Sequence, residues 1–206
     1  MNIASQINEV LRHVEFGESG NVITLQQTFP TSVDDLWDAC TTPARLARWF
    51  DGELREGGRY RMADSGTVGT IRTCDAPREL IITWEHGDDV SLVTAAFEEA
   101  PGGRSATLTV RHHGEDNEYW REYGPAAGGA GWDAAFLGLV MLLDDPDTLL
   151  DEVATLMRSA DGERFTELVV SEWSRAHQRA GAAADEADAA AGRAAELERE
   201  MWAADA

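Results

Sequence analysis

The densest group of side chains able to do chemistry is the run His112-His113-Gly114-Glu115-Asp116. Imidazole and carboxylate groups bind zinc and other transition metals, and both also transfer protons. Adjacent residues of a strand point to opposite faces, however, so His112 and His113 cannot readily bind one ion. No third ligand follows at the spacing of zinc signatures. We therefore expect solvated turn residues here, with no metal site and no cofactor.

Other candidates for catalysis occur singly. His86 ends a strand-like segment and could act as a general base, because histidine titrates near neutral pH; an ordinary loop histidine is the alternative. Cys40 and Cys74 lack a glycine-bounded nucleophile turn, so we interpret both as small buried side chains. Arg59 and Arg72 would hold a ligand carboxylate if they face inward, and otherwise lie on the outer face of a sheet. No catalytic motif is recognised, so the catalytic residues stay unknown.

Composition excludes several classes of partner. The chain has 17 basic and 38 acidic side chains, a net charge of −21, which is the wrong sign for nucleic acid or an anionic membrane surface. Gly57-Gly58 and Gly128-Gly129 lack the spacing and the lysine of a phosphate-binding loop. No signal or transit peptide is recognised, and the longest apolar run, Phe136 to Leu143, is too short to span a membrane. These observations predict a cytoplasmic protein.

The elements that must position these residues begin with a strand and two short helices. Asn21 to Phe29 alternates in the manner of a strand. Ser32 is a suitable N-cap for one helix, and Pro43 suits the first turn of the next. Ahead of them, apolar residues at helical spacing within residues 1–16 predict a short helix, with a strand beginning after Arg12.

An antiparallel sheet and a long helix follow. From Glu53 to His113, turn residues recur at intervals of about ten residues, which is typical of a meander of strands. Alternation along Leu80, Ile82 and Trp84, and along Ala106, Leu108 and Val110, gives these strands one apolar face that needs a cover. Pro125 to Leu143 supplies one broad apolar stripe: Trp132, Phe136, Leu139, Val140 and Leu143. Its first turns are rich in glycine, which lets another backbone or a ligand come close.

After Pro146 the chain reads as further helices. We therefore divide the chain into a domain of residues 1–145 and a helical C-terminal extension of residues 146–206. The extension carries large apolar side chains that need burial, either as a lid or in a homodimer contact. These side chains are Trp173, Leu197, Met201 and Trp202.

Several motifs together resemble the activator of heat-shock protein 90 ATPase homologue-like family, within the START-like (SRPBCC) superfamily. The resemblance covers roughly residues 9–143 and contains no shared catalytic motif. It implies an α+β helix-grip fold, with a curved antiparallel sheet of about six strands wrapped around the long helix, two short helices after the first strand, and the appended C-terminal helices. The motifs are Val33-Asp34-Asp35-Leu36-Trp37-Asp38-Ala39, Thr42-Pro43-Ala44-Arg45-Leu46-Ala47-Arg48-Trp49-Phe50, Gly57-Gly58-Arg59-Tyr60, Trp84-Glu85, Leu108-Thr109-Val110-Arg111-His112, Tyr123-Gly124-Pro125 and Gly131-Trp132-Asp133.

The resemblance further implies a hydrophobic cavity between the sheet and the long helix. Aromatic and large apolar residues suit such a cavity, although the same residues could equally be ordinary core packing. The candidates for lining it are Trp37, Trp49, Phe50, Tyr60, Met62, Ile71, Trp84, Phe97, Trp120, Trp132 and Phe136.

Three functions follow from this interpretation. The first is a binding module that holds an apolar or aromatic small molecule. The second is a cyclase- or hydrolase-type enzyme using the same cavity, with His86, His112 or a buried acid guiding the ligand. The third is stimulation of a chaperone ATPase through protein contact. The activators that give the family its name carry a separate chaperone-engaging domain before this one, and the roughly sixteen residues ahead of the first strand leave no room for it.

Overall fold

The computed structural model describes residues 3–17, 20–55, 58–62 and 65–204. Gly57 of the predicted glycine pair lies outside these ranges. The chain forms two compact units, each described here by itself. Unit 1 comprises Met1–Leu25, Glu115–Leu137 and Asp151–Ala206, and unit 2 comprises Gln26–Gly114 and Gly138–Leu150. These units do not test the predicted division at residues 145 and 146, which stays a prediction.

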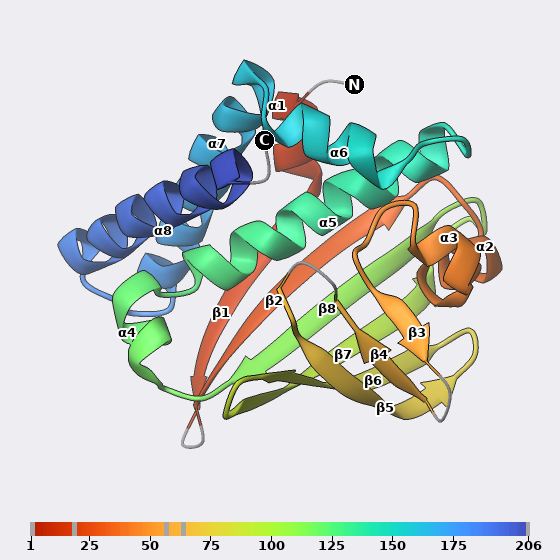
Figure 1. Ribbon diagram of the computed structural model, residues 1–206, viewed down its shortest axis with the longest axis horizontal. Helices are drawn as coiled ribbons and strands as arrows, with labels where there is room; N and C mark the ends of the chain where they lie inside the picture. The colour runs from red at the N-terminus through yellow and green to blue at the C-terminus, as the bar shows by residue number, and fades with distance from the viewer. Residues whose placement is uncertain (1–2, 18–19, 56–57, 63–64, 205–206) are drawn as a thin grey trace. The chain divides into compact units, whose positions relative to one another are not determined.

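The helices and strands follow the order expected of an α+β protein (Figure 1). They are α1 (Ile3–Glu9), β1 (Leu11–Gly17), β2 (Gly20–Phe29), α2 (Val33–Thr41), α3 (Pro43–Leu46), β3 (Glu53–Arg55), β4 (Arg59–Arg61), β5 (Val68–Asp75), β6 (Glu79–His86), β7 (Asp89–Glu99), β8 (Ala106–Gly114), α4 (Glu118–Tyr123), α5 (Ala126–Asp144), α6 (Leu150–Met157), α7 (Ala160–Arg179) and α8 (Ala184–Ala204).

The strands form one sheet in the order β1-β2-β8-β7-β6-β5-β4-β3. Each neighbouring pair from β3 to β7 along the chain is antiparallel, as is the β7–β8 pair. The sheet has eight strands rather than about six, because β1 and the short β3 add to the predicted meander. An antiparallel sheet, a long helix and C-terminal helices are the elements of the predicted helix-grip fold, so the fold class is confirmed.

The strand register in unit 2 defines an apolar face, which we call the Trp84 face. Ile71 pairs with Ile82 and Ile82 with Val93, while Trp84 pairs with Ser91. Because side chains alternate along a strand, these positions share one face. Its residues on β4 to β8 are Tyr60, Ile71, Leu80, Ile82, Trp84, Ser91, Val93, Ala95, Phe97, Leu108, Val110 and His112.

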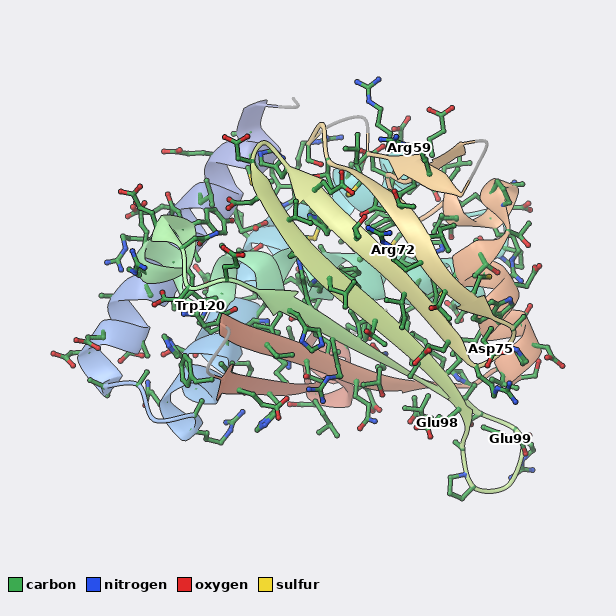
Figure 2. All side chains as sticks on the ribbon, turned by 90° about the horizontal axis from the view of Figure 1, so that it is seen from below. Arg59, Arg72, Asp75, Glu98, Glu99 and Trp120 are labelled. Atoms are coloured by element: carbon green, nitrogen blue, oxygen red, sulfur yellow. The ribbon has the colours of Figure 1, made fainter. Side chains whose placement is uncertain are left out.

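The opposite face of the sheet in unit 2 is polar. Gln26 donates a hydrogen bond to Thr109 at 3.0 Å, and the hydroxyls of Thr28 and Thr107 lie 2.9 Å apart. Arg59 precedes Tyr60 in β4 and therefore points away from the Trp84 face; Arg72, after Ile71 in β5, is likewise exposed (Figure 2). The alternative of outward-facing arginines is the correct one.

Local sequence signals fix the two short helices of unit 2. Ser32 caps α2, accepting a hydrogen bond from the backbone N–H of Asp35 at 3.2 Å, as predicted. Pro43 stands in the first turn of α3, also as predicted. The indole Nε1 of Trp49 donates to the carbonyl of Ala39 at 3.0 Å, which fixes the chain after α3 against α2.

Unit 1 contains a buried charge network. The Arg12 guanidinium in β1 donates to both carboxylate oxygens of Asp133 in α5, at 2.6 and 3.0 Å. The Trp173 indole in α7 donates to the same carboxylate at 2.8 Å. Burial raises the pKa of Asp133, and its bonds to Arg12 and Trp173 oppose that rise. Removing one partner of such a pair strands a buried charge, which costs about 3–5 kcal/mol.

Close packing accompanies this network. A Cβ added to Gly129 in α5 would lie 2.2 Å from the Trp173 ring, so only glycine lets α7 approach this closely. The glycines of α5 therefore admit a side chain of the same protein at this position. In the same unit, α7 and α8 run side by side (Figure 1).

The long helix α5 is buried beyond the predicted stripe. Phe136 and Leu139 are buried as expected, but Leu137 and Leu142 outside the stripe are buried as well. Among the described helices, α5 alone is long and apolar enough to cross a membrane, yet 61% of that window is buried inside the protein. Most of α5 is therefore packed as core.

Candidate functional site

Five rings on the Trp84 face and beside it form a continuous group, the Trp84 cluster. The ring of Trp84 lies 6.5 Å from Phe50, 6.2 Å from Tyr60 and 5.6 Å from His112, centroid to centroid. Trp49 extends the cluster, 5.4 Å from Phe50. All four contacts are tilted, at distances within the range usual for aromatic pairs.

The sheet holds Tyr60 in place through a glycine. Tyr60 pairs with Gly69, and a Cβ at Gly69 would lie 2.4 Å from the Tyr60 ring. The absent side chain lets the phenol cross β5 and donate a hydrogen bond to the Thr83 carbonyl at 2.7 Å. Burial raises the pKa of Tyr60, so this phenol stays protonated and serves the structure.

His112 supplies the polar group of the cluster. The Nε2 of His112 lies 2.8 Å from the hydroxyl oxygen of Ser91. The Ser91 hydroxyl donates a hydrogen bond to the Trp84 carbonyl at 3.2 Å. Burial, with a smaller effect of His113, lowers the pKa of His112 to about 4. At neutral pH the ring is therefore uncharged and can donate one hydrogen bond and accept another.

The Trp84 face is unevenly buried. Val93, Leu108 and Val110 are 2%, 3% and 3% exposed, so this part of the face is closed core. Toward β5 and β6, Ile71, Ile82 and the rings of Trp84 and Phe50 are half-buried, whereas Tyr60 and Trp49 are 5% and 7% exposed. The apolar side chains of this face that solvent can still reach therefore lie around Trp84.

The structure brings together most of the predicted cavity residues of unit 2. Tyr60, Ile71, Trp84 and Phe97 share the Trp84 face, while Trp49 and Phe50 join it through ring contacts. Whether they line one cavity stays a prediction. The remaining two are placed as follows: Trp37 packs on Phe97 with ring centroids 5.0 Å apart, and Met62 is half-buried just after β4.

The other three predicted residues belong to unit 1. Phe136 is 1% exposed and Trp132 half-buried, both on α5. Trp120 lies on α4 (Figure 2), where its ring is 6.0 Å from that of His177 and 6.2 Å from that of Phe16. Trp120 is therefore part of a different aromatic group from the Trp84 cluster.

The single catalytic candidates are mostly exposed. His86 is exposed at the end of β6, and His113 pairs with Leu92, on the face opposite His112. Cys40 is half-buried, and desolvation raises the pKa of its thiol to about 12, so it is unreactive. Cys74 is exposed, so the prediction that both cysteines are buried was wrong for Cys74. It lies near the end of β5, beyond the residues Val68 to Thr70 that pair with β4. No group of three metal-ligating side chains occurs among the described residues.

Sequence reasoning missed Ser91, the partner of His112. A signal for it existed in the two-residue turn Gly87-Asp88, where Gly87 has a φ of 59°. That turn pairs His86 with Asp89, and two residues further along each strand Trp84 pairs with Ser91. The contact of Ser91 with His112 of β8, in contrast, depends on strand pairing across the longer loop between Glu99 and Ala106.

Comparison with known proteins confirms the family predicted from the motifs. The family model described as "Activator of Hsp90 ATPase homolog 1-like protein" matches residues 30–144. No curated protein matches the chain in sequence.

Solved structures extend the likeness. The crystal structure of CalU16 from Micromonospora echinospora is 25% identical, with a TM-score of 0.63 over 82% of this chain and 98% of that chain. A conserved protein of unknown function from Enterococcus faecalis, EF2215, is 13% identical, with a TM-score of 0.61 over 84% of this chain and 95% of that one. PFC0360w, described as an HSP90 activator from Plasmodium falciparum, is 19% identical, with a TM-score of 0.50 over 59% of this chain and 94% of that one. The last two show the fold alone.

Part of the C-terminal segment belongs to this likeness. Residues 1–144 make up about 70% of the 206-residue chain, so the 82% match to CalU16 necessarily includes part of the segment that follows. The family model, in contrast, ends at residue 144. Part of the segment after residue 144 is therefore shared with CalU16.

Proposed function

This chain belongs to the Activator of Hsp90 ATPase homolog 1-like protein family, and we propose that it binds a small apolar, aromatic molecule on the Trp84 face. The observation that carries this proposal is the uneven burial of that face. Apolar side chains left half-buried around a group of aromatic rings offer a ligand contact area that the protein's own core does not use.

The polar group of the cluster narrows the ligand. His112 is neutral at pH 7 and lies 2.8 Å from the Ser91 hydroxyl, so the cluster places polar atoms without a charge among its rings. A neutral polar group in such surroundings raises the affinity for a ligand with one matching hydroxyl or carbonyl. It lowers the affinity for an ionised ligand, because the ligand's charge would lose its hydration without gaining a counterion. We therefore expect a phenol-like or ketone-bearing aromatic molecule.

Native mass spectrometry of freshly purified protein is the first test, since an apolar ligand from the host cell would appear as extra mass that is lost on denaturation. The second is calorimetric titration with 2-naphthol, an aromatic molecule with one hydroxyl. Trp84→Leu removes a ring but keeps an apolar side chain, and we expect about tenfold weaker binding. His112→Phe keeps a ring but removes the hydrogen bond, and we expect about fivefold weaker binding.

Trp202→Leu is the matched control, because it removes a half-buried tryptophan from α8 in unit 1. It should leave the affinity for 2-naphthol unchanged. Equal weakening by Trp84→Leu and Trp202→Leu, or no binding to the wild-type protein at millimolar concentration, would contradict the proposal.

A hydrolase is the second candidate, because Ser91 Oγ lies 2.8 Å from His112 Nε2, within reach of a nucleophile and its base. The Ser91 hydroxyl donates to the Trp84 carbonyl, however, and a pKa of about 4 makes His112 a weak base at neutral pH, so binding is the leading proposal. Hydrolysis of p-nitrophenyl butyrate, lost in Ser91→Ala and accompanied by labelling of Ser91 with a fluorophosphonate, would reverse this ranking.

A further inference from the structure

Unit 1 has a solvent-open cavity of about 850 Å³, lined partly by residues that lie outside the family match. Its lining residues lie at the end of β1, at the start of β2, in and beside α4, in α7 and in the first half of α8. The family model ends at residue 144, before α7 and α8 begin, so the C-terminal helices complete this cavity. The volume is sufficient for a small organic molecule.

Three rings stand at this cavity. The rings of Phe16 and Trp120 meet edge to face, 6.2 Å apart at 83°. His177 lies 5.8 Å from Phe16 and 6.0 Å from Trp120. Phe16 is 51% exposed, although a phenylalanine on a strand usually packs inward. The rings therefore leave aromatic surface open to a ligand.

The cavity lining has three carboxylates, of Asp116, Asp185 and Glu186, and two guanidiniums, of Arg121 and Arg193, so its net formal charge is −1. Asp185 and Glu186 lie in the first turn of α8, are exposed, and form no ion pair with another described side chain. Arg121, in contrast, is paired with Asp116 at 3.2 Å. The Nε of Arg193 donates to the Glu122 carbonyl at 2.8 Å. The Arg121–Asp116 pair cancels, whereas Arg193 bonds a neutral carbonyl and keeps its charge, so two exposed carboxylates stand against one guanidinium.

His177 adds no opposing charge. Its Nδ1 is buried without a hydrogen-bond partner among the described residues. Burial lowers the pKa of His177, and this effect outweighs the influence of Glu186, so the ring is neutral at neutral pH. All three rings therefore present uncharged π surfaces beside free carboxylates.

We propose that this cavity binds an organic cation, namely an ammonium group carried on a small aromatic or alkyl body. A cation is attracted to the faces of Trp and Phe rings, and nearby carboxylates add to that attraction. The same carboxylates repel an anion. A neutral ligand gains no electrostatic attraction from them. This ligand class differs from that proposed for the Trp84 face, so either proposal can fail without the other.

Two probes of nearly equal shape test the proposal by calorimetric titration of the full chain. Benzyltrimethylammonium carries the charge, and 2-methyl-1-phenyl-2-propanol replaces it with a neutral alcohol. We expect the cation to bind at least tenfold more tightly than the alcohol, with an affinity that falls as sodium chloride is added. Equal binding of the two probes, or no binding of the cation at millimolar concentration, would overturn the proposal.

Variants locate the site. Asp185→Asn with Glu186→Gln should weaken cation binding about fivefold, while Asp151→Asn with Glu152→Gln makes the same change in the first turn of α6 and should have no effect. Phe16→Leu should weaken cation binding about threefold without unfolding the protein, because this side chain is half exposed. If both double variants behave alike, the attraction comes from the overall charge of the protein and the site is disproved.

Discussion

The two units gather aromatic rings in similar ways but surround them with different charges. In unit 2, Trp84 and its neighbours share their face with a neutral histidine hydrogen-bonded to a serine. In unit 1, Phe16 and Trp120 stand beside the unpaired carboxylates of Asp185 and Glu186. The aromatic rings by themselves would predict the same class of ligand for both groups. In our two proposals, the charges next to the rings distinguish a site for a neutral aromatic molecule from a site for a cation.

The units also differ in where they place their ion pairs. The Arg12–Asp133 pair of unit 1 is almost fully enclosed, with side-chain exposures of 3% and 1%. In unit 2, Arg45 pairs with Asp35 and Asp38 at side-chain exposures of 28%, 44% and 50%. Water screens the second arrangement and not the first. Unit 1 should therefore depend far more on its charges for stability.

The largest expected effect follows from this difference. Asp133→Asn leaves the buried Arg12 charge without its counterion, and we expect a loss of about 3–5 kcal/mol in the free energy of unfolding by urea. Arg45→Met in unit 2 should cost at most about 1 kcal/mol. The double variant Arg12→Met with Asp133→Leu should recover most of the loss, because it removes both charges. Equal losses for Asp133→Asn and Arg45→Met would remove the contrast between the units.

A smaller effect tests how closely α5 and α7 must pack in unit 1. Gly129→Ala places a methyl group 2.2 Å from the Trp173 ring, and we expect it to lower the free energy of unfolding by about 2 kcal/mol. Gly131→Ala, two residues along the same helix, meets nothing within 4 Å. It should stabilise the protein by up to about 1 kcal/mol, because alanine favours helix. Thermal unfolding of the two variants should therefore shift in opposite directions.

The smallest effect contrasts the pH dependence of the units. In unit 2, the pKa of His112 is lowered by burial to about 4, so its charging opposes folding, and stability falls as pH drops from about 6.5 toward 4. In unit 1, burial raises the pKa of Glu198 to about 7, so stability falls as pH rises from about 4.5 through 7. Each shift is worth up to about 2 kcal/mol after screening by solvent.

Urea unfolding between pH 4 and 8 separates these two contributions. His112→Gln should remove the loss on the acid side, and Glu198→Gln should remove the loss toward neutral pH. A Glu198→Gln protein with the stability of the wild type at pH 8 would show that the carboxylate reaches water when it ionises.

Much of the fold could be predicted from local sequence. Ser32 and Pro43 mark the starts of α2 and α3 because capping and proline geometry act within a single turn. The face shared by Leu80, Ile82 and Trp84 follows from strand alternation, which needs no partner. The exposed Cys74 and the strand β3 were not foreseen, because exposure and short edge strands depend on neighbours distant in the sequence.

The candidate sites were only half predictable. The sequence named Trp84 and Tyr60 as ligand-facing residues, and strand register brings them together. It also named Trp120, but grouped it with the same residues, whereas the structure sets it beside Phe16 and His177. No periodicity within a helix or strand says which other element that helix or strand will contact.

By itself, then, the sequence determined the α+β class, the family, the apolar face of the sheet and the strongly acidic surface, because composition, capping and alternation are local properties. Tertiary structure decided which chemistry-bearing groups meet. Arg12 and Asp133 are 121 residues apart in the chain, yet they form a buried ion pair. Such contacts come from packing between distant elements, where the burial of each group fixes its charge and the shape left between side chains fixes what can bind.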